Sequence, residues 1–169
     1  MMHRLNTTIA VAALAASAAF AAESSPASAA PPEPACTITG TDGNDALVGT
    51  TGPDVICALG GNDFVRALGG DDTVFAGVGN DIVDAGDGVD TVSGGDGVDT
   101  LLGGPGDDQL AGDAGTDIVS GGRGSDSLAG GDGRDLLIGI DFVRGNDALD
   151  GGAEPDGCFA DPGDTITNC

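Results

Sequence analysis

Aspartate recurs every nine residues through the middle of the chain, and this spacing defines the chemistry that the carboxylates could do. From Gly40 the sequence divides into eleven consecutive rows of nine residues, ending at Ile138. Carboxylate oxygens are hard ligands, so a regular series of them favours binding of a hard divalent cation. The sixth residue of the successive rows is Asp45, Asp54, Asp63, Asp72, Asp81, Asp90, Asp99, Asp108, Asp117, Asp126 and Asp135.

Two further columns of the rows stay in phase with the aspartates. The fourth position is always glycine, from Gly43 to Gly133, which indicates a backbone conformation that a side chain would penalise. The eighth position is always leucine, isoleucine or valine, from Leu47 to Leu137, and it predicts a three-residue strand with one inward side chain. Three columns in phase over eleven rows exclude a disordered acidic linker, which has no reason to keep such a register.

Two rows together form one coil of turn, strand, turn and strand, and stacked coils give two parallel sheets with aliphatic side chains between them. Aspartates 18 residues apart then lie on the same edge of adjacent coils, about 4.8 Å apart. Such ladders of carboxylates repel one another unless a cation lies between the rungs. One edge carries Asp45, Asp63, Asp81, Asp99, Asp117 and Asp135, and the other carries Asp54, Asp72, Asp90, Asp108 and Asp126.

The rows resemble the RTX, or hemolysin-type, calcium-binding nonapeptide repeat, whose pattern is G-G-x-G-x-D-x-U-x with U aliphatic. The match is strict over residues 40–138 and looser toward the C-terminus. The resemblance implies an all-β, right-handed parallel β-roll (a β-solenoid) of stacked 18-residue coils, with Ca²⁺ in the turns. It also implies that each ion is bound by sixth-position aspartates two rows apart and by main-chain carbonyls. Up to about nine such pairs exist in the strict tract.

Calcium binding is expected to be coupled to folding. One buried aliphatic side chain per row cannot offset the conformational entropy of a glycine-rich chain, so the metal supplies the missing stabilisation. We therefore expect a disordered chain without Ca²⁺ and a compact roll with it. The fifth-position acids Asp71 and Asp107 are expected to be solvated charges and not ligands.

The pattern changes near both ends of the tract. Three extra residues follow Ile138 before Asp147 resumes the sixth position, so Asp147 is a further candidate ligand. We assign residues 36–150 to the roll and residues 151–169 to a degenerate C-terminal cap that keeps Asp156 in the sixth position. At the other end, Ile38 falls in an eighth position and predicts a partial first strand.

Four cysteines flank the repeats: Cys36 and Cys57 at the start, Cys158 and Cys169 at the end. In an oxidising compartment they favour disulfides, and pairing within each end closes one loop at each terminus. The sequence leaves the choice among three pairings open. A zinc site is disfavoured because no two cysteines have the C-x-x-C spacing.

The N-terminal segment has the pattern of an export signal. Arg4 precedes a short apolar run, and Ala19 and Ala21 supply a small-x-small cleavage site, which predicts a signal peptide over residues 1–21. A flexible Ala/Ser/Pro-rich leader is expected over residues 22–35. The mature chain is then secreted, released or held at the cell surface, without a transmembrane span. A retained anchor is the less favoured alternative.

Composition narrows the class of function. The net charge is −23 with five arginine and lysine residues in all, which excludes a basic face for nucleic acid or anionic membranes and favours calcium ions as the partner. The only histidine, His3, lies in the expected signal, so no nucleophile–histidine pair is available. EF-hand loops need a terminal glutamate, which the repeats lack. We expect a secreted, non-catalytic protein that binds several calcium ions.

The alternative is an extracellular structural or adhesive scaffold in which calcium is purely structural. Outward positions of the odd rows are largely apolar, whereas those of the even rows are mostly polar. A contiguous apolar stripe is typical of self-association or partner docking. The residues of this candidate partner face are Phe64, Ile82, Leu102, Ile118 and Leu136.

Overall fold

The computed structural model describes residues 35–143 and 145–169, which belong to one compact unit, Pro34–Cys169. The expected signal peptide (1–21) and the expected leader, apart from Ala35, lie outside the described residues. Within the described part of the chain there is no helix long and apolar enough to cross a membrane. All of the regular secondary structure there is β-strand.

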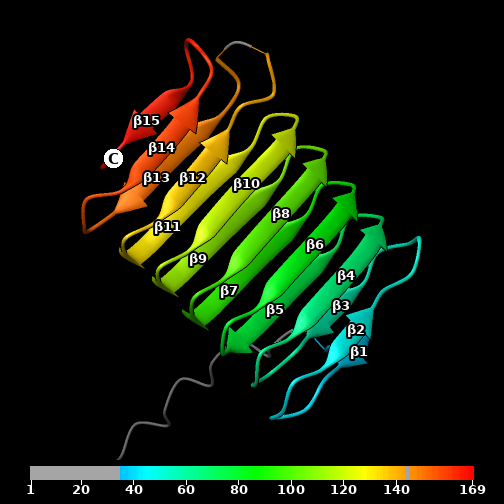
Figure 1. Cartoon of the computed structure of the whole chain (residues 1–169). Helices are drawn as coiled ribbons and strands as arrows, with labels where there is room; N and C mark the ends of the chain where they lie inside the picture. Colours follow the sequence, from blue (N-terminus) through cyan, green and yellow to red (C-terminus); the bar gives the residue numbers. More distant parts are fainter. Residues whose placement is uncertain (1–34, 144) are drawn as a thin grey trace, which may run out of the picture. The chain divides into compact units, whose positions relative to one another are not determined.

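The chain alternates strand by strand between two parallel sheets (Figure 1). In spatial order, the eight-stranded sheet comprises β1 (Ile38–Thr39), β3 (Val55–Cys57), β5 (Thr73–Val78), β7 (Thr91–Gly97), β9 (Gln109–Gly115), β11 (Ser127–Gly133), β13 (Ala148–Gly152) and β15 (Thr165–Thr167). The seven-stranded sheet comprises β14 (Gly157–Ala160), β12 (Leu136–Gly139), β10 (Ile118–Arg123), β8 (Thr100–Pro105), β6 (Ile82–Asp87), β4 (Phe64–Gly69) and β2 (Ala46–Val48). This is the all-β parallel β-roll that the sequence predicts.

The register between neighbouring strands is 18 residues, as the nine-residue rows require: Val119 pairs with Leu101 on one side and with Leu137 on the other. Each eighth-position side chain points between the sheets, and from Ile56 to Leu149 these side chains are at most 2% exposed. Ala58, Ala67, Ala76 and Ala85, which begin rows, are buried in the same core. Apart from these four alanines, each inner strand contributes one aliphatic side chain to the core, which is therefore thin.

The three-residue insertion after Ile138 and the C-terminal segment 151–169 both keep the strands in register. Leu128 on β11 pairs with Leu149 on β13, so the three inserted residues are confined to the turn between β12 and β13. The segment 151–169 continues the roll, because β14 pairs with β12 and β15 pairs with β13. Ile38 lies in the expected short first strand, β1.

The inner strands are longer than the predicted three residues, reaching seven in β7. Their pairing runs on into the glycine-rich turns, because main-chain groups there bond from coil to coil. The amide of Gly79 donates to the carbonyl of Asp96 at 2.8 Å, and the amide of Gly88 donates to the carbonyl of Pro105 at 3.0 Å. The turns are thus part of the hydrogen-bonded stack.

Disulfides close both ends of the roll. Cys36 bonds to Cys57, and Cys158 bonds to Cys169. Of the three pairings that the sequence left open, this one joins cysteines within each end. The first bond links the segment before β1 to β3, and the second links β14 to the C-terminus. Each bond therefore constrains a terminal coil that has a neighbour on one side only.

The fourth-position glycines explain why the coils can stack so closely, and Gly97 supplies a test. Its φ is +151°, and an added Cβ would overlap the carbonyl oxygen of Gly79 on the preceding coil. We expect Gly97→Ala to destabilise the roll by more than about 1–3 kcal/mol, from backbone strain plus displacement of the neighbouring turn. Urea unfolding in saturating Ca²⁺ measures this change.

The matched control is Gly60→Ala, because an added Cβ there comes no closer than 3.8 Å to any atom beyond the two adjacent residues of the chain. This variant is expected to unfold within about 1 kcal/mol of the parent. Equal midpoints for the two variants would contradict the close stacking of the turns.

Candidate metal sites in the turns

The aspartate ladders are held together by their own main chain. The amide of each ladder aspartate donates to Oδ1 of the aspartate on the next coil: Asp81 to Asp99 at 2.8 Å, and Asp90 to Asp108 at 2.9 Å. The same bond runs from Asp45 to Asp63 at one end and from Asp135 to Asp156 at the other. One oxygen of each carboxylate is therefore committed to the stack.

The second carboxylate oxygen, Oδ2, is buried and accepts no hydrogen bond in eleven of these aspartates. Ten of the eleven residues are at most 4% exposed, and Asp156 is partly exposed. A buried, unpartnered carboxylate oxygen is costly, and most such atoms in folded proteins have a partner. The eleven residues are Asp63, Asp72, Asp81, Asp90, Asp99, Asp108, Asp117, Asp126, Asp135, Asp147 and Asp156.

Main-chain oxygens border the same spaces. A Cβ added to Gly94 would lie 2.5 Å from Oδ2 of Asp99 and 2.8 Å from the carbonyl oxygen of Gly112. The equivalent position on Gly112 would lie 2.5 Å from Oδ2 of Asp117 and 2.7 Å from the carbonyl oxygen of Gly130. Each turn thus places a carboxylate oxygen near a carbonyl of the next coil, a donor set that fits a hard cation.

In the described residues, no three Asp, Glu, His or Cys side chains converge on one point. Consecutive rungs of one ladder bring two aspartates together, so a bound ion would take its other ligands from main-chain carbonyls or water. That set suits Ca²⁺, which accepts six to eight oxygens in flexible geometry. It does not suit Zn²⁺, which prefers nitrogen and sulfur ligands.

Burial makes the ionised carboxylates of the central coils unfavourable. Desolvation, with a smaller contribution from neighbouring ladder carboxylates, raises the pKa of Asp99, Asp108, Asp117 and Asp126 to about 6. The amide hydrogen bond to Oδ1 opposes this rise without cancelling it. Ionising these carboxylates at the centre of the roll thus costs free energy, and a bound cation would remove that cost.

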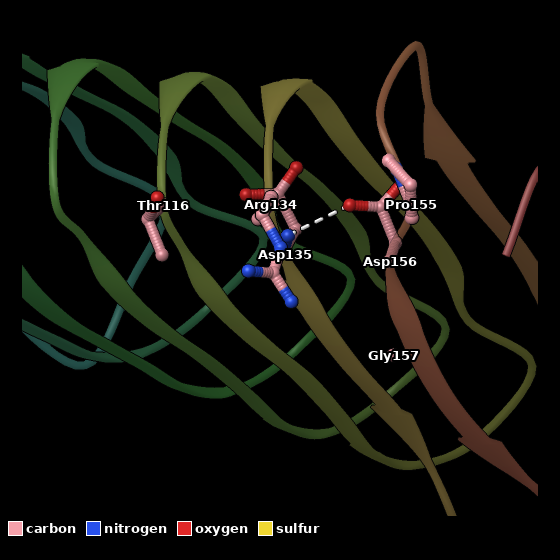
Figure 2. Close-up of a pocket in the computed structure, with 6 residues that line it drawn as sticks. All are labelled: Thr116, Arg134, Asp135, Pro155, Asp156 and Gly157. Atoms are coloured by element: carbon pink, nitrogen blue, oxygen red, sulfur yellow. Dashed lines mark hydrogen bonds between the residues drawn. The ribbon is translucent and has the colours of Figure 1, made fainter.

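Figure 2 shows two consecutive aspartates of one ladder, Asp135 and Asp156, beside a depression near the C-terminal end of the roll. A depression of about 560 Å³ is lined by Thr116, Arg134, Asp135, Pro155, Asp156 and Gly157. The amide of Asp135 donates to Oδ1 of Asp156 at 2.8 Å, and Oδ2 of both residues has no partner. The ladder therefore continues past the strict repeats.

The structure places all twelve predicted ligands in the two ladders. The inserted turn does not interrupt them, because the amide of Asp126 donates to Oδ1 of Asp147 at 2.8 Å. Asp156 was not among the predicted ligands, although its sixth-position register was the signal that could have identified it. Asp164, eight residues later, also occupies a rung: its Oδ1 accepts the amides of Gly145 and Asn146.

The fifth-position acids were expected to be only solvated charges, and the structure gives them a further role. Oδ1 of Asp71 accepts the amide of Val89 at 3.1 Å, and Oδ1 of Asp107 accepts the amide of Ser125 at 2.8 Å. On the other edge, Asn62 and Asn80 accept the equivalent amides. These exposed side chains cap the turns of the next coil.

Asp45 and Asp54, in the first two rows, are different from the other predicted ligands. Their Oδ2 atoms accept hydrogen bonds from Thr41 and Thr50, respectively. The hydrogen bond from the main-chain amide of Thr50 lowers the pKa of Asp54 below its usual value. The Oδ2 atoms of these two carboxylates therefore have protein donors, whereas the Oδ2 atoms of the other predicted ligands have none.

A parallel β-solenoid with two ladders of buried aspartates in glycine-rich turns has the architecture of a calcium-binding β-roll. The chain belongs to the RTX calcium-binding nonapeptide repeat family, whose model matches residues 39–74, 58–92, 66–101, 93–128 and 111–139. Together these matches span more than half of the chain. Comparisons with curated proteins and with solved structures gave no match.

The raised pKa values give the calcium-free roll an unusual pH dependence. In the folded form the pKa is about 6, compared with the ordinary 3.8, for Asp99, Asp108, Asp117 and Asp126. Between these two pH values the folded form therefore binds more protons than the unfolded form. We expect the metal-free roll to gain stability as pH falls from 7 toward 4, because proton binding favours the folded form there. Calcium affinity should fall over the same range, as protons compete for the carboxylates.

Far-UV circular dichroism of calcium-stripped protein at pH 7.5 and pH 5 measures the first effect, as β signal that is gained at the lower pH. Calcium titrations at the same two pH values measure the second. A metal-free roll that is less stable at pH 5 than at pH 7.5 would contradict the assignment.

Proposed function

We propose that this protein is a secreted, non-catalytic calcium-binding protein that folds into its β-roll on binding several Ca²⁺ ions. The observation that carries the proposal is the set of eleven buried Oδ2 atoms without a protein partner. In a metal-free folded state each would be a desolvated anionic oxygen with no donor. A divalent cation between two rungs supplies the missing partner for both.

Coupling of binding to folding follows from the thin core. Each inner strand buries one eighth-position aliphatic side chain, with four alanines in addition, while the turns carry the acidic ladders. In the unfolded chain these carboxylates are solvated and repel one another weakly; in the roll they are stacked and desolvated. Ion binding therefore stabilises the folded state selectively, and its free energy adds to the folding free energy.

The number of sites follows from the unpartnered oxygens. Asp63, Asp81, Asp99, Asp117, Asp135 and Asp156 leave five gaps on one edge, and Asp72, Asp90, Asp108, Asp126 and Asp147 leave four on the other. We propose about nine ions, one in each gap. The repeat count gives the same total, but here the series begins two rows later and extends to Asp156.

Export and the absence of catalysis are parts of the same proposal. Two disulfides, one at each end of the roll, are typical of proteins that fold in an oxidising compartment. This agrees with the signal pattern in the sequence. The buried aspartate pairs recur from coil to coil, as expected for ion binding, whereas a catalytic site is normally one distinct arrangement.

Calcium titration of the chelated protein tests the central claim. Far-UV circular dichroism should show a cooperative gain of β signal with Ca²⁺ and little change with Mg²⁺ at the same concentration. The reason is that the sites offer many oxygens without strict octahedral geometry. Isothermal titration should give about nine ions per chain. A chain fully folded in chelator, or one still disordered in millimolar Ca²⁺, would refute the proposal.

Neighbouring aspartates provide a matched pair of variants. Asp108→Asn removes a buried ligand oxygen but keeps the Oδ1 that accepts the amide of Asp90, whereas Asp107→Asn changes the exposed residue beside it. We expect Asp108→Asn to raise the calcium midpoint about tenfold or more and to lower the ion count. Asp107→Asn should behave like the parent, and equal effects of both variants would exclude Asp108 as a ligand.

A second candidate function, an extracellular scaffold that self-associates, is favoured by one face of the roll. On the outer side of the seven-stranded sheet, Phe64, Ile82, Thr100, Ile118 and Leu136 lie in register on adjacent strands. Phe64, Ile82 and Ile118 are 41–46% exposed, as is Leu102 beside them at 41%. We propose that a second copy of the chain packs weakly on this face.

Sedimentation velocity in Ca²⁺ tests this face with two matched variants. Phe64→Thr removes an apolar side chain from it, and Phe75→Thr removes one of similar exposure from the outer side of the other sheet. We expect concentration-dependent dimerisation of the parent, weakened by Phe64→Thr and not by Phe75→Thr. A parent that stays monomeric at high protein concentration would exclude self-association.

A further inference from the structure

The first coil of the roll satisfies its ladder carboxylates with protein groups. The amide and hydroxyl of Thr41 donate to Oδ2 of Asp45 at 2.6 and 2.9 Å. The amide and hydroxyl of Thr50 donate to Oδ2 of Asp54 at 2.7 and 2.9 Å. Each of these oxygens thus has two donors, whereas the same oxygen has none in the next nine rows.

Backbone conformation separates the first two turns from the others independently of these bonds. Residues 40–57, all of them described, contain no residue with positive φ. In each of the next nine rows the second and fourth residues have positive φ, even where the second residue is Leu59 at +80° or Leu68 at +86°. The first two turns are therefore closed by threonine side chains in a different local geometry.

The rest of the coil is also held together without an ion. The Cys36–Cys57 bond closes it, and Thr37 donates its hydroxyl to Oδ1 of Asp54 at 3.2 Å. Ile38 on β1 pairs with Ile56 on β3, so the coil has its own strand pairing. These interactions are covalent or made by neutral protein donors.

We propose that residues 36–57 form a calcium-independent first coil, in which Thr41 and Thr50 take the place of the ions, and that this coil templates the calcium-dependent coils after it. The coil offers the next one two correctly placed amides, because those of Asp45 and Asp54 donate to Asp63 and Asp72. It follows that Asp45 and Asp54 are not calcium ligands. The inference rests on the proposed function, since the later coils must require calcium.

Hydrogen–deuterium exchange of the full chain, read peptide by peptide in chelator and in Ca²⁺, tests the inference. In chelator we expect peptides within residues 37–57 to exchange at least tenfold more slowly than peptides within residues 63–135. In Ca²⁺ both regions should be protected. Equal exchange of the two regions in chelator would overturn the independence of the first coil.

The double variant Thr41→Gly/Thr50→Gly tests the role assigned to the threonines, because several later rows carry glycine at the second position. We expect residues 37–57 to lose protection in chelator and to regain it in Ca²⁺, with more ions bound per chain. Thr51→Gly is the matched control: the structure gives the side chain of its neighbour Thr50, not that of Thr51, a bond to Asp54. This control should retain the parent's protection.

A third variant separates the threonines from the disulfide. Cys36→Ser/Cys57→Ser should keep part of the protection of residues 37–57 in chelator. If that protection disappears with the disulfide and is unchanged in the threonine variant, the proposal for Thr41 and Thr50 is overturned. The proposed function fails separately if residues 63–135 are already protected in chelator or stay unprotected in Ca²⁺. In either case the threonine variant still shows whether Thr41 and Thr50 hold the first coil together without calcium.

Discussion

The stability of the roll depends on whether each turn supplies a partner for a carboxylate that the stacking of the coils has buried. Stacking commits Oδ1 of every inner ladder aspartate to an amide of the neighbouring coil, which fixes where Oδ2 points. Oδ2 is then desolvated whether or not a partner is present. A fold built this way carries an electrostatic penalty along both edges at neutral pH, and the penalty is larger near the centre, where desolvation by burial, with a smaller contribution from neighbouring carboxylates, raises the pKa of Asp99 and Asp126 to about 6.

The hydrophobic core and the ladders cannot be separated energetically. Each inner coil buries two eighth-position aliphatic side chains, which set the register of the sheets. The glycine-rich turns nevertheless lose more conformational entropy than so thin a core can offset. The same glycines allow the coils to approach closely enough for the turns to hydrogen-bond to one another. Close stacking, burial of carboxylates and a requirement for cations are thus consequences of one backbone arrangement.

Much of this arrangement could be predicted because the repeat is strict. The period of nine and the single aliphatic column define coils, sheets and register, and they locate Asp147 beyond the insertion because Leu149 follows it by two residues. The prediction was less complete where side chains meet across coils. Asp71 and Asp107 cap amides of the next coil, a contact between residues 18 apart that no local pattern distinguishes from a solvated charge. Asp156 was not predicted as a ligand because Cys158 replaces the aliphatic residue that stands two positions after the aspartate in the strict rows.

By itself, the sequence determined the fold, the two aspartate ladders and the family, because a strict period constrains every coil in the same way. Only the tertiary structure decided which carboxylates have protein partners. Threonine stands at the second position of the first two rows, yet its effect depends on backbone geometry: with negative φ the amide and hydroxyl of Thr50 reach Oδ2 of Asp54. In the later rows the second residue has positive φ, and Oδ2 remains without a donor. That difference arises from how each turn folds against its own carboxylate, which the nine-residue pattern does not record.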